Sequence, residues 1–190
     1  MYCRINYLKP LLKLFGLQAV CMIGCAMVIM MFPGLVSFRF GEILYSFSAL
    51  VIAFDLFFTS AWTLGAKHRR DVNTHNRHLS DGEEPMGYCY KSGAILGGIY
   101  ALFCLILCII CLIASESTVA GISVAGNMVY KLWFIEYFVA FKYIVRLNNL
   151  LCILIALSTF VPIFTGFICG IKDVNYVEMF MNRIVYKKSK

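Results

Sequence analysis

Residues 94–115 read AILGGIYALFCLILCIICLIAS, a stretch of 22 positions without a charged side chain. A helix rises about 1.5 Å per residue, so about 20 residues are enough to cross the hydrocarbon core of a bilayer. A stretch of this length and composition predicts a transmembrane helix. The fold class then depends on how often the rest of the chain repeats the pattern.

Three further windows are also long and apolar, at about 14–36, 43–65 and 147–170, with Asp55 as a charged residue in the second. Over all 190 residues, 61% are hydrophobic and 14% charged, whereas an average soluble domain is about half apolar and a quarter charged. A globule of this size has no core large enough for that excess. These numbers exclude a soluble enzyme, a secreted disulfide scaffold and a disordered tail. They predict an all-α integral membrane protein, a single membrane domain with four transmembrane helices.

Lys and Arg are distributed unevenly between the two sides that four spans define. Thirteen of the 17 lie in the N-terminal segment, the 66–93 loop or the 171–190 tail, and the other four lie in the two remaining connections. Cytoplasmic flanks of transmembrane helices carry the excess of basic residues. We therefore expect a plasma-membrane protein with both termini in the cytoplasm. Contact with anionic lipid headgroups then explains the net charge of +7, and no nucleic-acid partner is predicted.

The connection at 116–146 has two parts. Residues 117–126 are small and polar, which predicts a loop. Residues 131–146 are rich in aromatic side chains but include Glu136 and Lys142, and a charge in the bilayer core is costly. We therefore predict an external loop whose second part is an interfacial helix, with a re-entrant element as the alternative. The aromatic residues expected at headgroup level are Trp133, Tyr137 and Tyr143.

Small side chains recur along the 94–115 helix and the turn before it, at steps of three and four residues that keep them on one face. The face consists of Gly93, Gly97, Ala101, Cys104, Cys108 and Cys111. Small residues let helices approach closely in lipid, so we interpret this as a helix-packing face, with contact to a second copy as the alternative. Cys108 and Cys111 lack a second pair of ligands, so no zinc site is predicted.

Asp55 is the most informative residue of the 43–65 window, because it lies near the bilayer midplane. A charged side chain there costs about 2.5–3.5 kcal/mol on insertion scales, so we expect Asp55 to face the helix bundle and find a partner. Ser48 and Thr59 share its helical face. Two interpretations stay open: a contact for an ion, proton or substrate, and a hydrogen-bonded carboxyl that fixes helix register.

A short repeat relates the ends of the second and fourth windows. Gly65-Ala66-Lys67 and Gly170-Ile171-Lys172 lie 105 residues apart, and Asp-Val-Asn follows both, after three intervening residues in the first copy. Two hairpins related by duplication would give this pattern. A glycine followed by lysine is also a good helix stop at a cytoplasmic interface, so the repeat has an alternative, purely local explanation.

The residues at 170–175 and the Tyr-Lys-Lys at 186–188 carry a resemblance. The chain resembles small four-span integral membrane proteins of Gram-positive anaerobes, which carry a Gly-x-Lys-Asp-like cytoplasmic helix end and a short tail ending in Tyr-Lys-Lys. The resemblance implies a bacterial plasma membrane and a four-span layout. It implies no activity.

The histidines all lie in the 66–93 loop, where Asn, Gly and Pro surround His75 and His78. This pattern favours a solvated loop over a metal site, and no metal or cofactor is predicted. The chain also loosely resembles the accessory gene regulator B family of membrane cysteine peptidases, which would cast His78 as base and Cys89 as nucleophile. The Gly-Gly-x-His context of that family is absent, and the spacing of 11 residues is longer than the family's.

The chain contains no nucleotide-binding loop, no paired-carboxylate constellation and no nucleophile–base motif. We therefore expect a non-enzymatic accessory or interaction subunit of a membrane complex. Its expected partners are the lipid bilayer and either a second copy or another membrane subunit. The alternative is a small oligomeric transporter or channel that uses Asp55, and a membrane-embedded enzyme such as a cysteine peptidase comes third.

Overall fold

The computed structural model describes residues 7–79, 84–137 and 149–174, and the regular elements of this part of the chain are all helices. They are α1 (Leu8–Met31), η1 (Pro33–Val36), α2 (Arg39–Arg77), α3 (Lys91–Ser115), α4 (Ala120–Trp133), η2 (Ile135–Tyr137), α6 (Asn149–Ser158) and α7 (Phe160–Lys172). Within the described residues, four helical stretches are long and apolar enough to cross a membrane: α1, α2, α3 and Cys152–Lys172. This confirms the predicted number of apolar helices, as expected for a multi-pass membrane protein.

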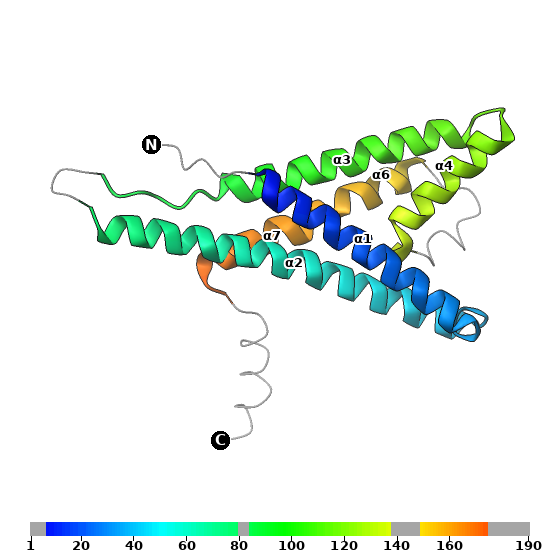
Figure 1. The fold of residues 1–190 in the computed structure, drawn as a ribbon, viewed down its shortest axis with the longest axis horizontal. Coiled ribbons are helices and arrows are strands. Elements are labelled where there is room, and N and C mark those ends of the chain that lie inside the picture. The colour runs from blue at the N-terminus through cyan, green and yellow to red at the C-terminus, as the bar shows by residue number, and fades with distance from the viewer. Residues whose placement is uncertain (1–6, 80–83, 138–148, 175–190) are drawn as a thin grey trace, which may run out of the picture.

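The four stretches form one bundle in which α7 packs along both α2 and α3, and α1 lies against α2 (Figure 1). Four helical segments meet at one end of the bundle: the start of α1, the C-terminal part of α2, the start of α3 and the end of α7. Two contacts tie them there: the Tyr7 hydroxyl donates to Ser92 Oγ at 3.4 Å, and Arg69 Nη1 lies 2.7 Å from Asp173 Oδ2. This end is called the polar end below.

The core of the bundle runs along its axis. It is built from aromatic side chains set against small ones, including Phe57, Tyr100, Phe134 and Phe167 with Ala61, Cys104, Cys108, Cys152 and Ala156. Large exposed hydrophobic side chains cover much of the outer surface, including Met30, Phe40, Phe47 and Ile113. An outside more apolar than that of a soluble domain is what a lipid solvent requires.

Helices α1 and α2 have different boundaries from the predicted windows at 14–36 and 43–65. α1 begins at Leu8 and ends at Met31, because Pro33 cannot continue the helix. α2 begins at Arg39 and does not stop at Gly65 but continues to Arg77, so the first part of the predicted 66–93 loop is helical. Its 39 residues span about 58 Å, well beyond the ~30 Å of a hydrocarbon core. Buried His68 and Val72 give this extension its own tertiary contacts.

The predicted loop at 117–126 is wrong beyond its first residues, since α4 begins at Ala120. After the short turn at Glu116, α4 folds back along α3 (Figure 1). Gly126 makes this return close: a β-carbon there would lie 2.7 Å from the Ala114 Cβ and 2.9 Å from the Cys111 carbonyl oxygen. Small residues that read as loop in the sequence therefore serve close helix packing.

The second part of that connection also differs from the expected interfacial helix. α4 ends at Trp133. The chain then turns into the bundle at Phe134, Ile135 and Glu136, each of which is at most 7% exposed. For residues 131–137 the structure therefore shows the end of one helix and a buried turn, and the re-entrant alternative for 131–146 stays a prediction. The rest of the predicted interfacial helix, including Lys142 and Tyr143, lies outside the described residues.

The fourth predicted span, 147–170, is two helices. α6 ends at Ser158 and α7 starts at Phe160, with Thr159 between them. Pro162 explains the break, because its ring clashes with the carbonyl of the residue four positions earlier, Ser158, and it has no N–H to donate there. The Thr159 hydroxyl turns inward at the break and donates to the Ala156 carbonyl at 2.8 Å.

Candidate functional site

Asp55 lies on the outer surface of α2, so the expectation that it faces the bundle is wrong. Its neighbours Val51, Ile52 and Phe54 are about half exposed. The Thr59 hydroxyl donates a hydrogen bond to Asp55 Oδ1, and at 3.5 Å this bond is long. Ser48 and Thr59 are exposed as well. Ser48, Asp55 and Thr59 therefore form an outer polar stripe on an otherwise apolar helix surface.

The reason for this orientation is a second pattern in the same helix. Small and aromatic side chains recur every four residues and face α7 and the core: Ala49, Ala53, Phe57 and Ala61, each at most 6% exposed. Asp55 is two residues from both Ala53 and Phe57, which places it about 200° around the helix from them. The free energy gained by packing these four inward side chains exceeds the free-energy cost of one carboxylate on the outer surface.

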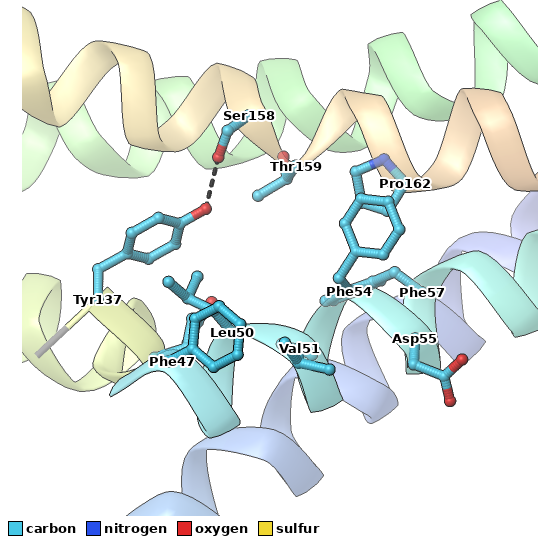
Figure 2. Close-up of a pocket in the computed structure, with 12 residues that line it drawn as sticks. Phe47, Leu50, Val51, Phe54, Asp55, Phe57, Tyr137, Ser158, Thr159 and Pro162 are labelled. Atoms are coloured by element: carbon cyan, nitrogen blue, oxygen red, sulfur yellow. Dashed lines mark hydrogen bonds between the residues drawn. The ribbon is translucent and has the colours of Figure 1, made fainter. Parts of the chain in front are cut away.

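A pocket of about 460 Å³ lies next to the stripe, between α2, η2 and the α6–α7 break. Aromatic and aliphatic side chains from α2 form one wall, and Tyr137, Ser158 and Thr159 supply polar groups opposite (Figure 2). The Tyr137 hydroxyl is hydrogen-bonded to Ser158 Oγ at 2.6 Å. Asp55 stands at the rim with its carboxylate directed away from that pair (Figure 2).

Glu136 also lines this pocket, and its side chain is only 3% exposed. Gln18 of α1 donates to Glu136 Oε1 at 3.4 Å and to the Trp133 carbonyl oxygen, and the Tyr100 hydroxyl donates to Gln18 Oε1 at 3.5 Å. Glu136 Oε2 is buried and has no hydrogen-bond partner among the residues that the structure describes. Because a buried polar atom without a partner is rare in folded proteins, this oxygen marks the pocket as chemically unusual.

Sequence reasoning missed Glu136, because it placed the residue in the headgroup layer. One signal was present. Gln18 is an amide within the first apolar window, where a polar side chain needs a partner inside the bundle. Its partners, Trp133 and Glu136, are more than a hundred residues away along the chain.

The small-residue face of α3 is buried within the chain. A β-carbon at Gly93 would meet the Phe167 ring, and one at Gly97 would lie 3.1 Å from Phe160 Cδ2. The rest of the face is also buried, at 5% exposure or less: Ala101, Cys104, Cys108 and Cys111. The elements that cover it are α4, α6 and α7. The face is therefore not free to contact a second copy. The eight cysteines that the structure describes form no disulfide with one another.

Cys89 lies against a different histidine from the one that the peptidase comparison requires. The Cys89 backbone N–H donates to His68 Nε2 at 3.0 Å, and the Ser92 hydroxyl donates to Cys89 Sγ at 3.2 Å. His78 follows ten residues after His68, about 15 Å further along α2. The structure therefore does not pair His78 with Cys89, and Cys89 joins a hydrogen-bonded cluster that holds the start of α3 to α2.

Comparison with protein-family models, with curated proteins and with solved structures finds no match for the chain. Two features of the described structure bear on its function. The first is the outer polar stripe around Asp55, and the second is the neighbouring pocket that contains Glu136.

Proposed function

We propose that the chain is a non-enzymatic interaction subunit of a membrane complex, and that a helix of another membrane protein docks on the outer polar stripe. The observation that supports this is the exposure of Asp55 in the middle of an apolar helix. A carboxylate at this depth costs about 2.5–3.5 kcal/mol unless it finds a partner, and the long bond from Thr59 is a poor one. A docked helix with a cation or amide offsets that cost.

The occupant is a different protein rather than a second copy, by charge complementarity. The Lys and Arg residues of the described apolar helices lie at or beyond the ends of the apolar windows, at positions such as Lys13, Arg39, Lys67 and Lys172. A second copy would therefore bring only another carboxyl and hydroxyls to Asp55. A partner helix with Lys, Arg or His at mid-depth forms a charge-assisted hydrogen bond with it.

A photo-crosslinker placed at Ser48 or Thr59 in the full-length protein tests this in native membranes. We expect an adduct with one other membrane protein, and peptide mapping should locate the link in a transmembrane segment that contains a basic residue. The same crosslinker at Ile106 and Ile110, which are exposed on α3, is the matched control and should give no such adduct. Asp55→Leu should abolish the adduct.

Asp55→Leu also separates docking from folding. The substitution removes an exposed carboxylate from an apolar surface, so the isolated subunit should express and fold at least as well as the wild type. If Asp55→Leu leaves the adduct unchanged, or if the adduct has the mass of two copies of this chain, the proposal is wrong. Exchanging the charges, with Asp55→Lys in this chain and Asp in place of the partner's basic residue, should restore the link.

A second candidate function, a small oligomeric transporter or channel, is favoured by the pocket itself. The two titratable carboxyls among its described lining residues are Asp55 at the rim and Glu136 inside, and aromatic side chains form much of the same lining. Carboxylates among aromatic faces suit a lipophilic cation. The test is binding of tetraphenylphosphonium to the purified protein and its flux in vesicles. Glu136→Gln should abolish both, and Glu116→Gln, at an exposed residue outside the pocket, should change neither.

We further propose a plasma-membrane location with both termini in the cytoplasm. The 13-to-4 distribution of basic residues supports this orientation, as does the position of Tyr7 and Val174 at the same end of the bundle. Green fluorescent protein fused after residue 190 should be fluorescent, and alkaline phosphatase at the same point should be inactive. Active phosphatase there would reverse the orientation.

A further inference from the structure

A second pocket, of about 260 Å³, lies among α1, α2 and α3 towards the polar end. Three of its lining residues are cations: Lys13 from α1, with Lys67 and Arg70 from α2. No acidic residue is among the described residues that line it, and the salt bridge of the described chain, between Arg69 and Asp173, involves none of the three. We call this site the basic pocket. The described residues that line the pocket therefore give it a net positive charge.

The α2 side of the basic pocket is one continuous polar face. Ser60, Thr63, Lys67 and Arg70 follow one another at steps of three and four residues, which places them along one side of the helix. Lys13 faces them from the second turn of α1. Three like charges brought to one pocket repel one another, so a bound anion would stabilise their arrangement.

The floor of the basic pocket is apolar. Leu14, Ala61 and Leu96 line it, and each is only 1% exposed. The cations lie where the apolar windows end, because Lys13 directly precedes the window at 14–36 and Lys67 closely follows the one at 43–65. The pocket therefore combines cations at headgroup level with an apolar surface on the bilayer side.

We infer that the basic pocket binds the phosphate group of an anionic phospholipid. Lys and Arg are the side chains that bind phosphate oxygens, and basic pockets between transmembrane helices at the cytoplasmic face suit lipid headgroups. A free phosphate ion has the same charge chemistry. The lipid is the better occupant because Lys13 and Lys67 lie where the apolar windows end, which is the level of phospholipid headgroups.

Spin-labelled lipids test the site on the full-length protein in nanodiscs. We expect phosphatidylglycerol to associate about tenfold or more in preference to phosphatidylcholine, since each nearby cation contributes on the order of fivefold. In the variant K13Q/K67Q/R70Q the preference should fall towards unity. The matched control is R77Q/K91Q/K172Q, which removes two Lys and one Arg that are exposed and lie outside the pocket.

The control decides between a site and a general surface charge. If both triple variants lose the preference equally, the inference is wrong, because total charge and not the pocket selects the lipid. A second arm uses inorganic phosphate and glycerol phosphate with protein in neutral detergent. Binding of these soluble anions as tight as that of phosphatidylglycerol would overturn the lipid assignment. Circular dichroism and gel filtration confirm that both variants are folded.

Discussion

Gly65 of α2 and Gly170 of α7 lie in contact, since a β-carbon on Gly170 would fall 3.0 Å from the Gly65 Cα. The surrounding contacts are reciprocal. A β-carbon on Gly170 would meet Trp62 and Ala66, and one on Gly65 would meet Phe167 and Ile171. Each α7 residue of this set is 105 positions after its α2 counterpart, the spacing of the two Gly-x-Lys motifs. Because α2 continues past Gly65 to Arg77, Gly65 serves close helix packing and is not a helix stop, and the duplication stays a prediction.

Gly65→Ala and Gly170→Ala should therefore each destabilise the bundle to a similar degree. In both, a methyl group would overlap the backbone of the facing helix, and overpacking of this kind costs about 1–3 kcal/mol or more. Thermal unfolding in a mild detergent measures the effect. Gly98→Ala is the matched control: a β-carbon there has no atom within 4 Å, so it should gain up to about 1 kcal/mol from helix propensity. Equal behaviour of all three variants would contradict the packing account.

The sequence predicts the number of apolar helices correctly, whereas the prediction that Asp55 faces the bundle is wrong. Apolar windows of about 20 residues have one stable solution in lipid, which is a helix. The direction of one residue depends on which neighbours pack, and the pattern of Ala49, Ala53, Phe57 and Ala61 outweighs a single carboxylate. Reading that spacing first would have placed Asp55 outside.

The burial of Glu136 is missed for a different reason. Its burial depends on α4 folding back along α3 and on Gln18, which is 118 residues away in the sequence. The small residues that permit the fold-back, such as Gly126, have the composition of a loop. Composition alone does not distinguish a polar connection from a helix that packs closely.

Gln18→Leu should destabilise the protein by about 1–3 kcal/mol, because it removes the hydrogen bond to Glu136 and leaves that carboxyl buried without a donor. Chemical unfolding of the single and double variants measures this. In the Glu136→Leu background the same substitution should cost much less, since no buried carboxyl is left without the Gln18 donor. Additive effects of the two changes would mean that Gln18 and Glu136 are not coupled.

Asn76→Ala should loosen the connection between α2 and α3. Asn76 Nδ2 donates to the Met86 carbonyl at 3.0 Å, and the Met86 N–H donates to Asn76 Oδ1 at 2.8 Å, so one side chain holds both polar groups of that residue. We expect faster hydrogen exchange and protease cleavage around Met86, with the spans unaffected. His75→Ala removes an exposed neighbour and should leave both rates unchanged. The prediction is wrong if the two variants behave alike.

The ion pair between Arg69 and Asp173 should give a pH dependence at the polar end. The hydrogen bond from the Arg69 guanidinium lowers the pKa of Asp173, which caps α7 in a left-handed conformation at φ 60°. A carboxyl with a lowered pKa in the folded state stabilises the fold above its unfolded pKa of about 3.9, and the contribution is lost as pH falls through the folded value. Carbon-13 NMR titration of the carboxyl should show a midpoint below 3.9. Arg69→Gln should return it to the usual range, whereas Arg70→Gln, which removes the next cation along α2, should leave it low. A midpoint insensitive to Arg69 would show that the ion pair does not form in solution.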